Sequence, residues 1–251
     1  MLTPQRHQLI LTMLKQQGVV KVQELVDATQ ASESTVRRDL IELEKLKLLK
    51  RVHGGAALLQ GKGSEPSIAE KFAKNLEEKK AIARHAATLV EDGDCIYLDA
   101  GSTVGELIPY LSGKQIVVVT NGLSHLDRMD ATNIKCHILG GMVKASTKAV
   151  IGSMALDQLR HFRFDRCFLG VNGIHPEMGY TTPDPEEARL KRLARTLSGQ
   201  TYVLADQSKF AEISFAQFAE IEEAVLVTSR IPEESRAAYE NKTYVIEVGT
   251  P

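Results

Sequence analysis

The sequence has 251 residues, of which 43% are hydrophobic and 25% are charged, and its formal net charge is −1. This composition is ordinary for a globular protein and excludes a collagen-like, fibrous or disordered chain. The length exceeds the usual size of one domain, so we expect one small module and one larger domain. Apolar runs stay far below the roughly 20 residues of a membrane helix, and the polar start shows no export signal. We therefore expect a cytoplasmic protein without a membrane partner.

The charge is distributed unevenly along the chain. Residues 1–60 hold nine Lys or Arg against six Asp or Glu, a net charge of +3, which leaves −4 for the rest. A small basic module on an acidic body suits a nucleic-acid partner. The three cysteines are scattered and have neither the spacing of a disulfide framework nor that of a zinc site, so we expect no metal.

The beginning of the chain predicts a helix, a short strand and a second helix. Thr3 and Pro4 favour a helix start, because threonine can cap and proline suits the first helical position. Residues 19–22 are rich in valine and predict a short strand. A brief second helix is expected around Leu25.

A third helix is the candidate recognition helix. Ser32 is placed to cap it, and its inward stripe consists of Val36, Leu40 and Leu43. The first two turns of the outward face carry hydroxyl and guanidinium groups, from Ser34, Thr35, Arg37 and Arg38. A helix in the major groove presents such groups to bases and phosphates. Asp39 would repel phosphates, so we expect it to pair inside the module, with Arg6 as the candidate partner.

Two short strands around a glycine turn, residues 48–52 and 56–59, follow as a candidate wing. The expected DNA contacts of this hairpin are Lys50, Arg51, His53 and Gly54. By itself an Arg-Arg pair is usually a solvated helix face. The order of helix, turn, helix and hairpin around Arg37 and Arg38 favours DNA binding instead.

Three stretches of this module resemble the DNA-binding signature of the DeoR family of bacterial repressors. They are Arg6 with Ile10 and Leu14, the run SESTVRRDL over residues 32–40, and the run RVHGGA over residues 51–56. The resemblance implies a winged helix-turn-helix domain, placed here at residues 1–58. It also implies binding to operator double-stranded DNA as a homo-oligomer, usually a dimer or tetramer.

Residues 59–68, with glycine and polar side chains, are interpreted as a linker, and residues 69–251 as the second domain. Residues 68–90 follow one long helical pattern. Strand-like and helix-like segments alternate beyond it, with expected strands at 95–98, 116–120, 135–139, 166–171, 201–205, 224–227 and 244–248. Their nearly continuous apolar character predicts an α/β domain with a mainly parallel sheet covered on both faces.

Polar loops follow five of these strands, at the rim where such sheets bind ligands. Their candidate ligand-binding residues are Asp99, Gly101, Ser102, Thr103, Asn121, Gly140, Gly141, Asp206 and Lys209, and Asn172 lies in the remaining loop. Glycine, hydroxyls and free amides suit a phosphate. Each loop alone is also what an ordinary capping turn contains, but five on one rim favour a binding site.

The resemblance continues over about residues 71–250, which are similar to the DeoR sensor domain in the runs LDAGST at 98–103, VTN at 119–121, LGG at 139–141 and DQSKF at 206–210. That domain is similar in fold to ribose-phosphate isomerase and coenzyme A transferases, which implies a phosphorylated sugar as ligand. The family's effector-responsive positions match Lys71, Lys79, Asp206 and Lys209, although Lys80 competes with Lys79. The chain is most similar to the fructose-operon type, so fructose 1-phosphate is the first candidate ligand.

Two other classes of function compete with a sugar-phosphate-responsive repressor. A sugar-phosphate isomerase with an appended DNA-binding module would need a general base, for which Asp99, Glu186, Glu187 and Asp206 are available. No motif specifies catalysis or a cofactor, so we expect no catalytic residues and no enzyme. A purely structural adaptor would leave the polar rim unexplained. The charged segment 186–192 either contributes to the pocket or faces water.

Overall fold

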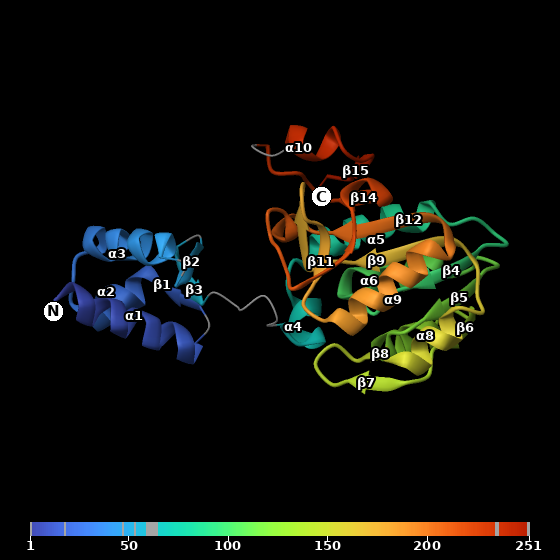
Figure 1. The fold of residues 1–251 in the computed structure, drawn as a ribbon, viewed down its shortest axis with the longest axis horizontal. Helices are drawn as coiled ribbons and strands as arrows, with labels where there is room; N and C mark the ends of the chain where they lie inside the picture. The colour runs from blue at the N-terminus through green and yellow to red at the C-terminus, as the bar shows by residue number, and fades with distance from the viewer. Residues whose placement is uncertain are drawn as a thin grey trace. The chain divides into compact units, whose positions relative to one another are not determined.

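A computed structural model describes residues 2–17, 19–46, 48–52, 54–58, 65–233 and 236–249. The chain divides into two compact units, residues 1–61 and residues 62–251. Figure 1 shows the first unit in blue and the second in the remaining colours. Each unit has its own hydrophobic core, so each is described by itself.

The first unit is a three-helix module with a small antiparallel sheet. Its elements are α1 Thr3–Gln17, β1 Val19–Lys21, α2 Val22–Thr29, α3 Glu33–Lys45, β2 Leu49–Val52 and β3 Gly55–Leu58. The sheet order is β1-β3-β2. Position 55 has no room for a side chain, because a Cβ there would lie 2.2 Å from the carbonyl oxygen of Val20 on the neighbouring strand. The close approach of β3 to β1 therefore depends on this glycine.

The core of this unit confirms the expected stripe of the third helix. Val36, Leu40 and Leu43 are all buried, together with residues of α1 and the sheet. Ser32 caps α3 as expected, because its side chain accepts a hydrogen bond from the Thr35 amide at 3.3 Å. The hairpin turns at Gly54, whose φ of +76° lies in the left-handed region that glycine adopts without strain.

The second unit is built on a parallel sheet of seven described strands. The strands are β4 Cys95–Leu98, β5 Val117–Thr120, β6 Lys135–Ile138, β9 Phe164–Gly170, β12 Ser198–Ala205, β14 Val225–Thr228 and β15 Val245–Glu247. Their order is β15-β14-β12-β9-β4-β5-β6, and every neighbouring pair is parallel. The expected α/β fold is thus confirmed, and all carboxyl ends meet at one edge.

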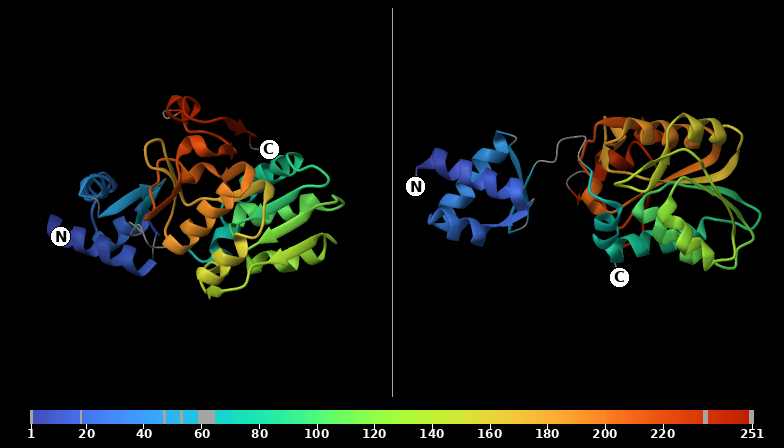
Figure 2. Two further views of the ribbon diagram at one scale, coloured as in Figure 1. Left: turned by 45° about the vertical axis from the view of Figure 1, so that its right-hand side comes forward. Right: turned by 90° about the horizontal axis from the view of Figure 1, so that it is seen from below.

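Helices cover both faces of this sheet (Figure 2). They are α4 Ile68–Ala73, α5 Leu76–Thr88, α6 Ser102–Leu107, α7 Leu126–Asp130, α8 Ser153–Leu159, α9 Pro185–Thr196 and α10 Arg236–Glu240, with short 3-10 turns at Ile108–Leu111, Leu123–His125, Gln207–Lys209 and Ile221–Glu223. One core layer joins α5 and α6 to the sheet, and the other joins α8 and α9. Among the described residues, no helix combines the length and apolar character needed to cross a membrane.

The structure corrects the expectation of one helix over residues 68–90. The segment forms two helices, α4 and α5, because Lys74 is extended and Asn75 has a φ of +53°. Asparagine tolerates this left-handed conformation better than most residues. The Asn75 amide also donates to Asp206 Oδ1 at 2.9 Å, which helps to hold the break in place.

The sequence also missed short antiparallel strands outside the main sheet. These are β7 Met142–Lys144, β8 Ala149–Ile151, β10 Gly173–His175, β11 Gly179–Thr182 and β13 Ala216–Ala219. Strands β7 and β8 pair with each other, and β10, β11 and β13 form a separate sheet. Runs of three or four residues are too short to show a clear alternation of apolar and polar side chains.

Candidate functional site

The face of α3 that points away from the core carries the candidate DNA-contacting side chains. Ser34, Arg37 and Arg38 are exposed, and Thr35 is half-buried. Arg37 pairs along the helix with Glu33, at 2.6 Å between its guanidinium and the Glu33 carboxylate. Both partners are exposed, so this pair is weak and can open for another anion.

Asp39 is turned inward and pairs with Arg6, as the sequence suggested. Its two carboxylate oxygens accept from the Arg6 guanidinium at 2.7 and 2.9 Å, and the His7 ring lies 3.1 Å away. Burial alone would raise the pKa of Asp39, but its hydrogen bonds to Arg6 and His7 lower it below its usual value. Asp39, His7 and Glu42 place possible ligand atoms within 4.8 Å of one another, although Arg6 already engages both Asp39 oxygens.

The wing holds one of its basic residues against the recognition helix. Arg51 donates from its backbone amide and from Nε to the Glu44 carboxylate, at 2.8 and 2.6 Å. Gly54 forms the exposed turn. The side chain of Lys50 and the whole of His53 lie outside the described residues, so their expected DNA contacts stay predictions.

In the second unit, four of the residues singled out by the sequence come together near the end of β12. The buried Asp206 carboxylate attracts the ammonium groups of Lys79 and Lys209, and Lys71 repels both. Burial lowers the pKa of Lys79 to about 8 and also lowers that of Lys209. Lys79 further donates to the backbone carbonyl of Lys71, which ties α5 to α4. We call Lys71, Lys79, Asp206 and Lys209 the lysine cluster.

The structure distinguishes Lys79 from its neighbour Lys80. Lys79 is only 3% exposed and lies in the lysine cluster. The side chain of Lys80 is 39% exposed and pairs with Glu77 on the same helix, at 3.0 Å. Of the two candidates, the geometry therefore favours Lys79.

Asp99, at the end of β4, is bound to protein groups. Its carboxylate forms a buried ion pair with Lys191 of α9 and accepts from the Gly170 amide at 2.8 Å. Gly101 follows, and a Cβ there would lie 3.1 Å from the Gly170 Cα, so two loops of the rim touch through backbone. Ser102 and Thr103 open α6 and are buried.

Asn121, Gly140 and Gly141 have clear backbone roles. Asn121 is buried, accepts from the Tyr97 hydroxyl and the Ala100 amide at 3.0 and 3.1 Å, and donates to a carbonyl of β8. Gly141 has a φ of +151°, and a Cβ there would lie 2.7 Å from the Ile151 carbonyl oxygen. Both glycines follow β6, four strands away from β12, which is about 19 Å at the usual strand spacing. Within the described residues, no contact joins them to the lysine cluster.

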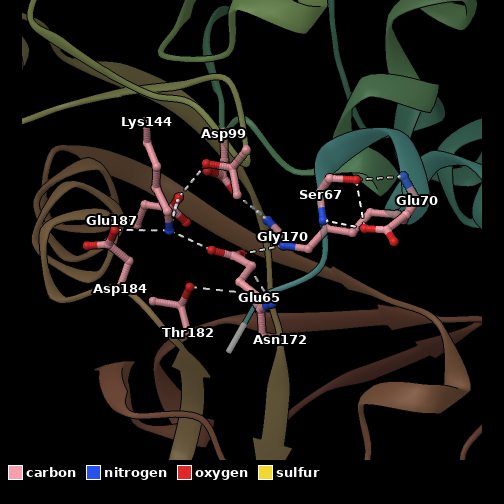
Figure 3. Close-up of polar contacts among 12 residues, drawn as sticks. Glu65, Ser67, Glu70, Asp99, Lys144, Gly170, Asn172, Thr182, Asp184 and Glu187 are labelled. Atoms are coloured by element: carbon pink, nitrogen blue, oxygen red, sulfur yellow. Dashed lines mark hydrogen bonds and ion pairs between the residues drawn. The ribbon is translucent and has the colours of Figure 1, made fainter. Parts of the chain in front are cut away.

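The sequence interpretation missed a second charged group, which surrounds Glu65 (Figure 3). The Glu65 side chain is 5% exposed and forms ion pairs with Lys71 and with Lys144 of β7, the latter at 2.5 Å. Lys144 also pairs with Asp184 at 2.9 Å and Glu187 at 3.1 Å. Glu65 lies in the segment that the sequence predicts to be a linker, where glycine and polar neighbours give no sign of burial.

The charged segment 186–192 divides into two faces. Glu187 and Lys191, four residues apart on α9, are buried and point toward Lys144 and Asp99. Glu186 and Arg189 pair with each other on the outer side at 3.0 Å. Glu187 and Lys191 share the helix side of the buried Ala188 and Ala194, and this spacing in the sequence could have indicated that they point inward.

His125 is another residue that the sequence did not single out. It is fully buried, and neither ring nitrogen has a hydrogen-bond partner among the described residues. Burial lowers its pKa to about 4, so the ring is neutral near pH 7. Its ring packs closely against Gly122 and Gly105.

Comparisons with known proteins support both halves of this description. Residues 6–62 match the model of the DeoR-like helix-turn-helix domain, and residues 74–230 match that of the DeoR C terminal sensor domain. The chain is 51% identical to a transcriptional regulator named FruR from Bacillus subtilis, over 98% of each chain. It is 34% identical to a lactose phosphotransferase system repressor from Staphylococcus epidermidis, over 85% of this chain and 86% of the relative.

Among solved structures, the likeness is partial. Ribose 5-phosphate isomerase A from Neisseria gonorrhoeae matches 53% of each chain with a TM-score of 0.39 and 17% identity. eIF2B beta from Chaetomium thermophilum matches 69% of this chain and 56% of its own, with a TM-score of 0.48 and 11% identity. These scores are too low to support a functional argument, and the expected kinship to coenzyme A transferases stays a prediction.

Proposed function

Because the chain belongs to the DeoR family of transcriptional regulators, we propose that it represses a sugar-utilisation operon and releases the operator when a phosphorylated sugar binds. Fructose 1-phosphate is the first candidate effector. Relatives that match nearly the whole chain are named as regulators and repressors rather than enzymes. One of them is named FruR and another a lactose phosphotransferase system repressor, and the second name supports a sugar-related signal.

The outward face of α3 supports the DNA-binding half of the proposal. Ser34, Arg37 and Arg38 stand exposed at the beginning of a helix whose other face is fixed in the core. Arginine can bind guanine O6 and N7 with its planar fork or clamp a phosphate. The inward pairing of Asp39 with Arg6 keeps a carboxylate away from the DNA phosphates.

The lysine cluster is the observation that carries the sensor half. The ammonium groups of Lys79 and Lys209 lie near the buried Asp206 carboxylate, and Lys71, which pairs with Glu65, adds a third ammonium close to both. The lowered pKa values of Lys79 and Lys209 show that burial makes their charges costly. A dianionic phosphate would compensate this excess positive charge, and Asp206 would accept from sugar hydroxyls.

The candidate bases for an isomerase reaction are engaged in the structure. Asp99 is paired with Lys191. Asp206 accepts from Asn75 and from the Ser208 amide and hydroxyl, and its pKa lies below the usual value because Lys209 and these hydrogen bonds outweigh burial. A general base needs a pKa nearer the working pH. These contacts favour binding over proton transfer.

Calorimetric titration with a panel of phosphorylated sugars tests the proposal. Wild type should bind fructose 1-phosphate, whereas Lys209→Ala should lose at least tenfold in affinity because one ammonium is gone. Lys80→Ala, a lysine change on the exposed side of α5, is the matched control and should bind like wild type. If no phosphorylated sugar in the panel binds the wild type, the sensor half of the proposal is wrong.

The same variants connect binding to DNA release. In a gel-shift titration with operator DNA, wild type should release the DNA on addition of the sugar phosphate. Lys209→Ala should still bind the operator but should no longer respond at the same sugar concentration. We propose a homo-oligomer, dimer or tetramer, as the DNA-bound form, which light scattering of the free protein and its operator complex can measure.

A further inference from the structure

Glu65 places a carboxylate on Lys71, one of the lysines that we propose bind the effector's phosphate. Its side chain is 5% exposed, and its two carboxylate oxygens pair with different lysines. One oxygen pairs with Lys71, and the other pairs with Lys144 (Figure 3). Burial alone would raise the pKa of Glu65, but Lys71 and Lys144 lower it below its usual value, so the group is an anion at neutral pH. Lys71 also belongs to the lysine cluster.

Among the acids around Lys144, Glu65 is held least firmly by the fold. Asp184 caps α9 and accepts from the Glu186 amide at 2.8 Å, and Glu187 lies on α9 and accepts from Thr147 at 2.8 Å. Glu65 lies outside any helix or strand, and its further contact is Asn172 at 3.4 Å. Three carboxylates close to one ammonium repel one another, so Glu65 is the one that an incoming anion can replace.

The chain is anchored again only two residues after Glu65. Ser67 caps α4 and forms a reciprocal capping box with Glu70, at 2.8 and 3.3 Å between the capping groups. The Ile68 amide donates to the Ser146 carbonyl at 2.8 Å. Release of Glu65 would therefore leave α4 in place.

We propose that Glu65 is a built-in competitor of the effector: its carboxylate occupies the ammonium of Lys71, which belongs to the lysine cluster, and the effector's phosphate displaces it. This inference rests on the proposed function and names the route by which that site is regulated. The fixed end of the linker moves from residue 65 to residue 67. Roughly 7 Å of extended chain is thereby added to the segment that precedes α4.

The exchange of one anion for another has a thermodynamic consequence. In the free protein the phosphate must replace the Glu65 carboxylate on Lys71, so part of its attraction to Lys71 is offset. Removing the Glu65 charge should therefore strengthen effector binding. It should also favour the state that has low affinity for the operator before any effector is added. In our proposal the effector shifts the protein toward that state because it binds that state more tightly, and it does so by displacing Glu65.

Glu65→Gln tests this inference with a change of charge at nearly constant shape. The variant should bind fructose 1-phosphate at least fivefold more tightly than wild type in calorimetric titration, and inorganic phosphate should show the same order. Its operator affinity without ligand should approach that of wild type saturated with ligand. Glu70→Gln is the matched control, because glutamine can also complete the capping box, and it should behave like wild type in both assays.

Hydrogen exchange on the wild-type protein gives a second measurement that needs no variant. The amide of Glu65 should exchange faster when fructose 1-phosphate is bound, while the amides of α4 should not change. Equal or weaker effector binding by Glu65→Gln, or equal or slower exchange of the Glu65 amide, would overturn the role of Glu65 and leave the proposed function intact. If neither wild type nor Glu65→Gln binds any phosphorylated sugar, the proposed function fails, and the exchange fails with it.

Discussion

If Lys79 belongs to the effector site, its lowered pKa should make effector binding sensitive to pH above neutrality. In the free protein Lys79 has a pKa of about 8, mainly because burial disfavours its ammonium form. Its charge is present below pH 8 and is lost as the pH rises through that value. A bound phosphate dianion favours the ammonium and raises this pKa. Above pH 8, Lys79 must therefore take up a proton from solvent when the effector binds, and the affinity for the effector falls.

The size of this effect follows from the pKa. If the complex keeps Lys79 protonated, the dissociation constant should rise about eightfold between about pH 7.5 and about pH 9, which corresponds to about 1.3 kcal/mol. The phosphate itself does not contribute to this change, because its second pKa is near 6. Lys209, whose pKa is also lowered by burial, should add to the fall in affinity in the same direction.

Calorimetric titration of fructose 1-phosphate at several pH values measures this dependence. Lys79→Arg is the informative variant, because arginine stays protonated throughout this range, and it should remove most of the pH dependence while keeping a positive charge. Proton uptake on binding at pH 9, seen as a dependence of the heat on the buffer, should accompany it in wild type. A wild-type affinity that is constant from pH 7.5 to 9 would refute the assignment of Lys79 to the effector site.

Three further predictions follow from other parts of the structure. Arg38→Ala should weaken operator binding by about 1 to 3 kcal/mol at an unchanged melting temperature, because its side chain is exposed on α3; equal operator affinity in a gel shift would contradict this. Asp39→Ala should destabilise the winged helix by about 2 to 4 kcal/mol, since Arg6 loses both bonds to a buried carboxylate, and urea unfolding of the full chain checks it. The pKa of His125 is about 4 in the folded protein, so as the pH falls the unfolded chain takes up a proton before the folded protein does. The free energy of unfolding should therefore fall by about 3 kcal/mol from pH 6.5 to pH 4. In urea unfolding His125→Gln should show a smaller fall, and an equal fall would exclude His125 as the cause.

The parallel sheet was predictable because its strands are buried on both faces. Residues 95–98 and 201–205 form nearly continuous apolar runs, and such runs identify a covered strand without further information. The break between α4 and α5 could not be foreseen. The apolar spacing continues across Asn75, and only the contact with Asp206, 131 residues later in the chain, shows why the helix stops there.

The candidate site was predictable where a motif marked it and hidden where only tertiary contacts define it. Lys79 and Lys209 came from resemblance to a family, and the structure brings them to one place. Glu65 and Lys144 lie in segments of ordinary polar composition, and only the folded chain brings them within 2.5 Å. Long-range ion pairs of this kind leave no periodic signal in the sequence.

We propose that a sugar phosphate and operator DNA bind the same protein with opposing effects. Thermodynamic linkage requires each ligand to weaken the other by the same factor. The decisive measurement is the affinity for fructose 1-phosphate with and without saturating operator DNA, compared with operator affinity with and without the sugar. We expect an equal loss of affinity in both directions, about 5- to 150-fold for a typical coupling. A sugar affinity that is unchanged by operator DNA would contradict it.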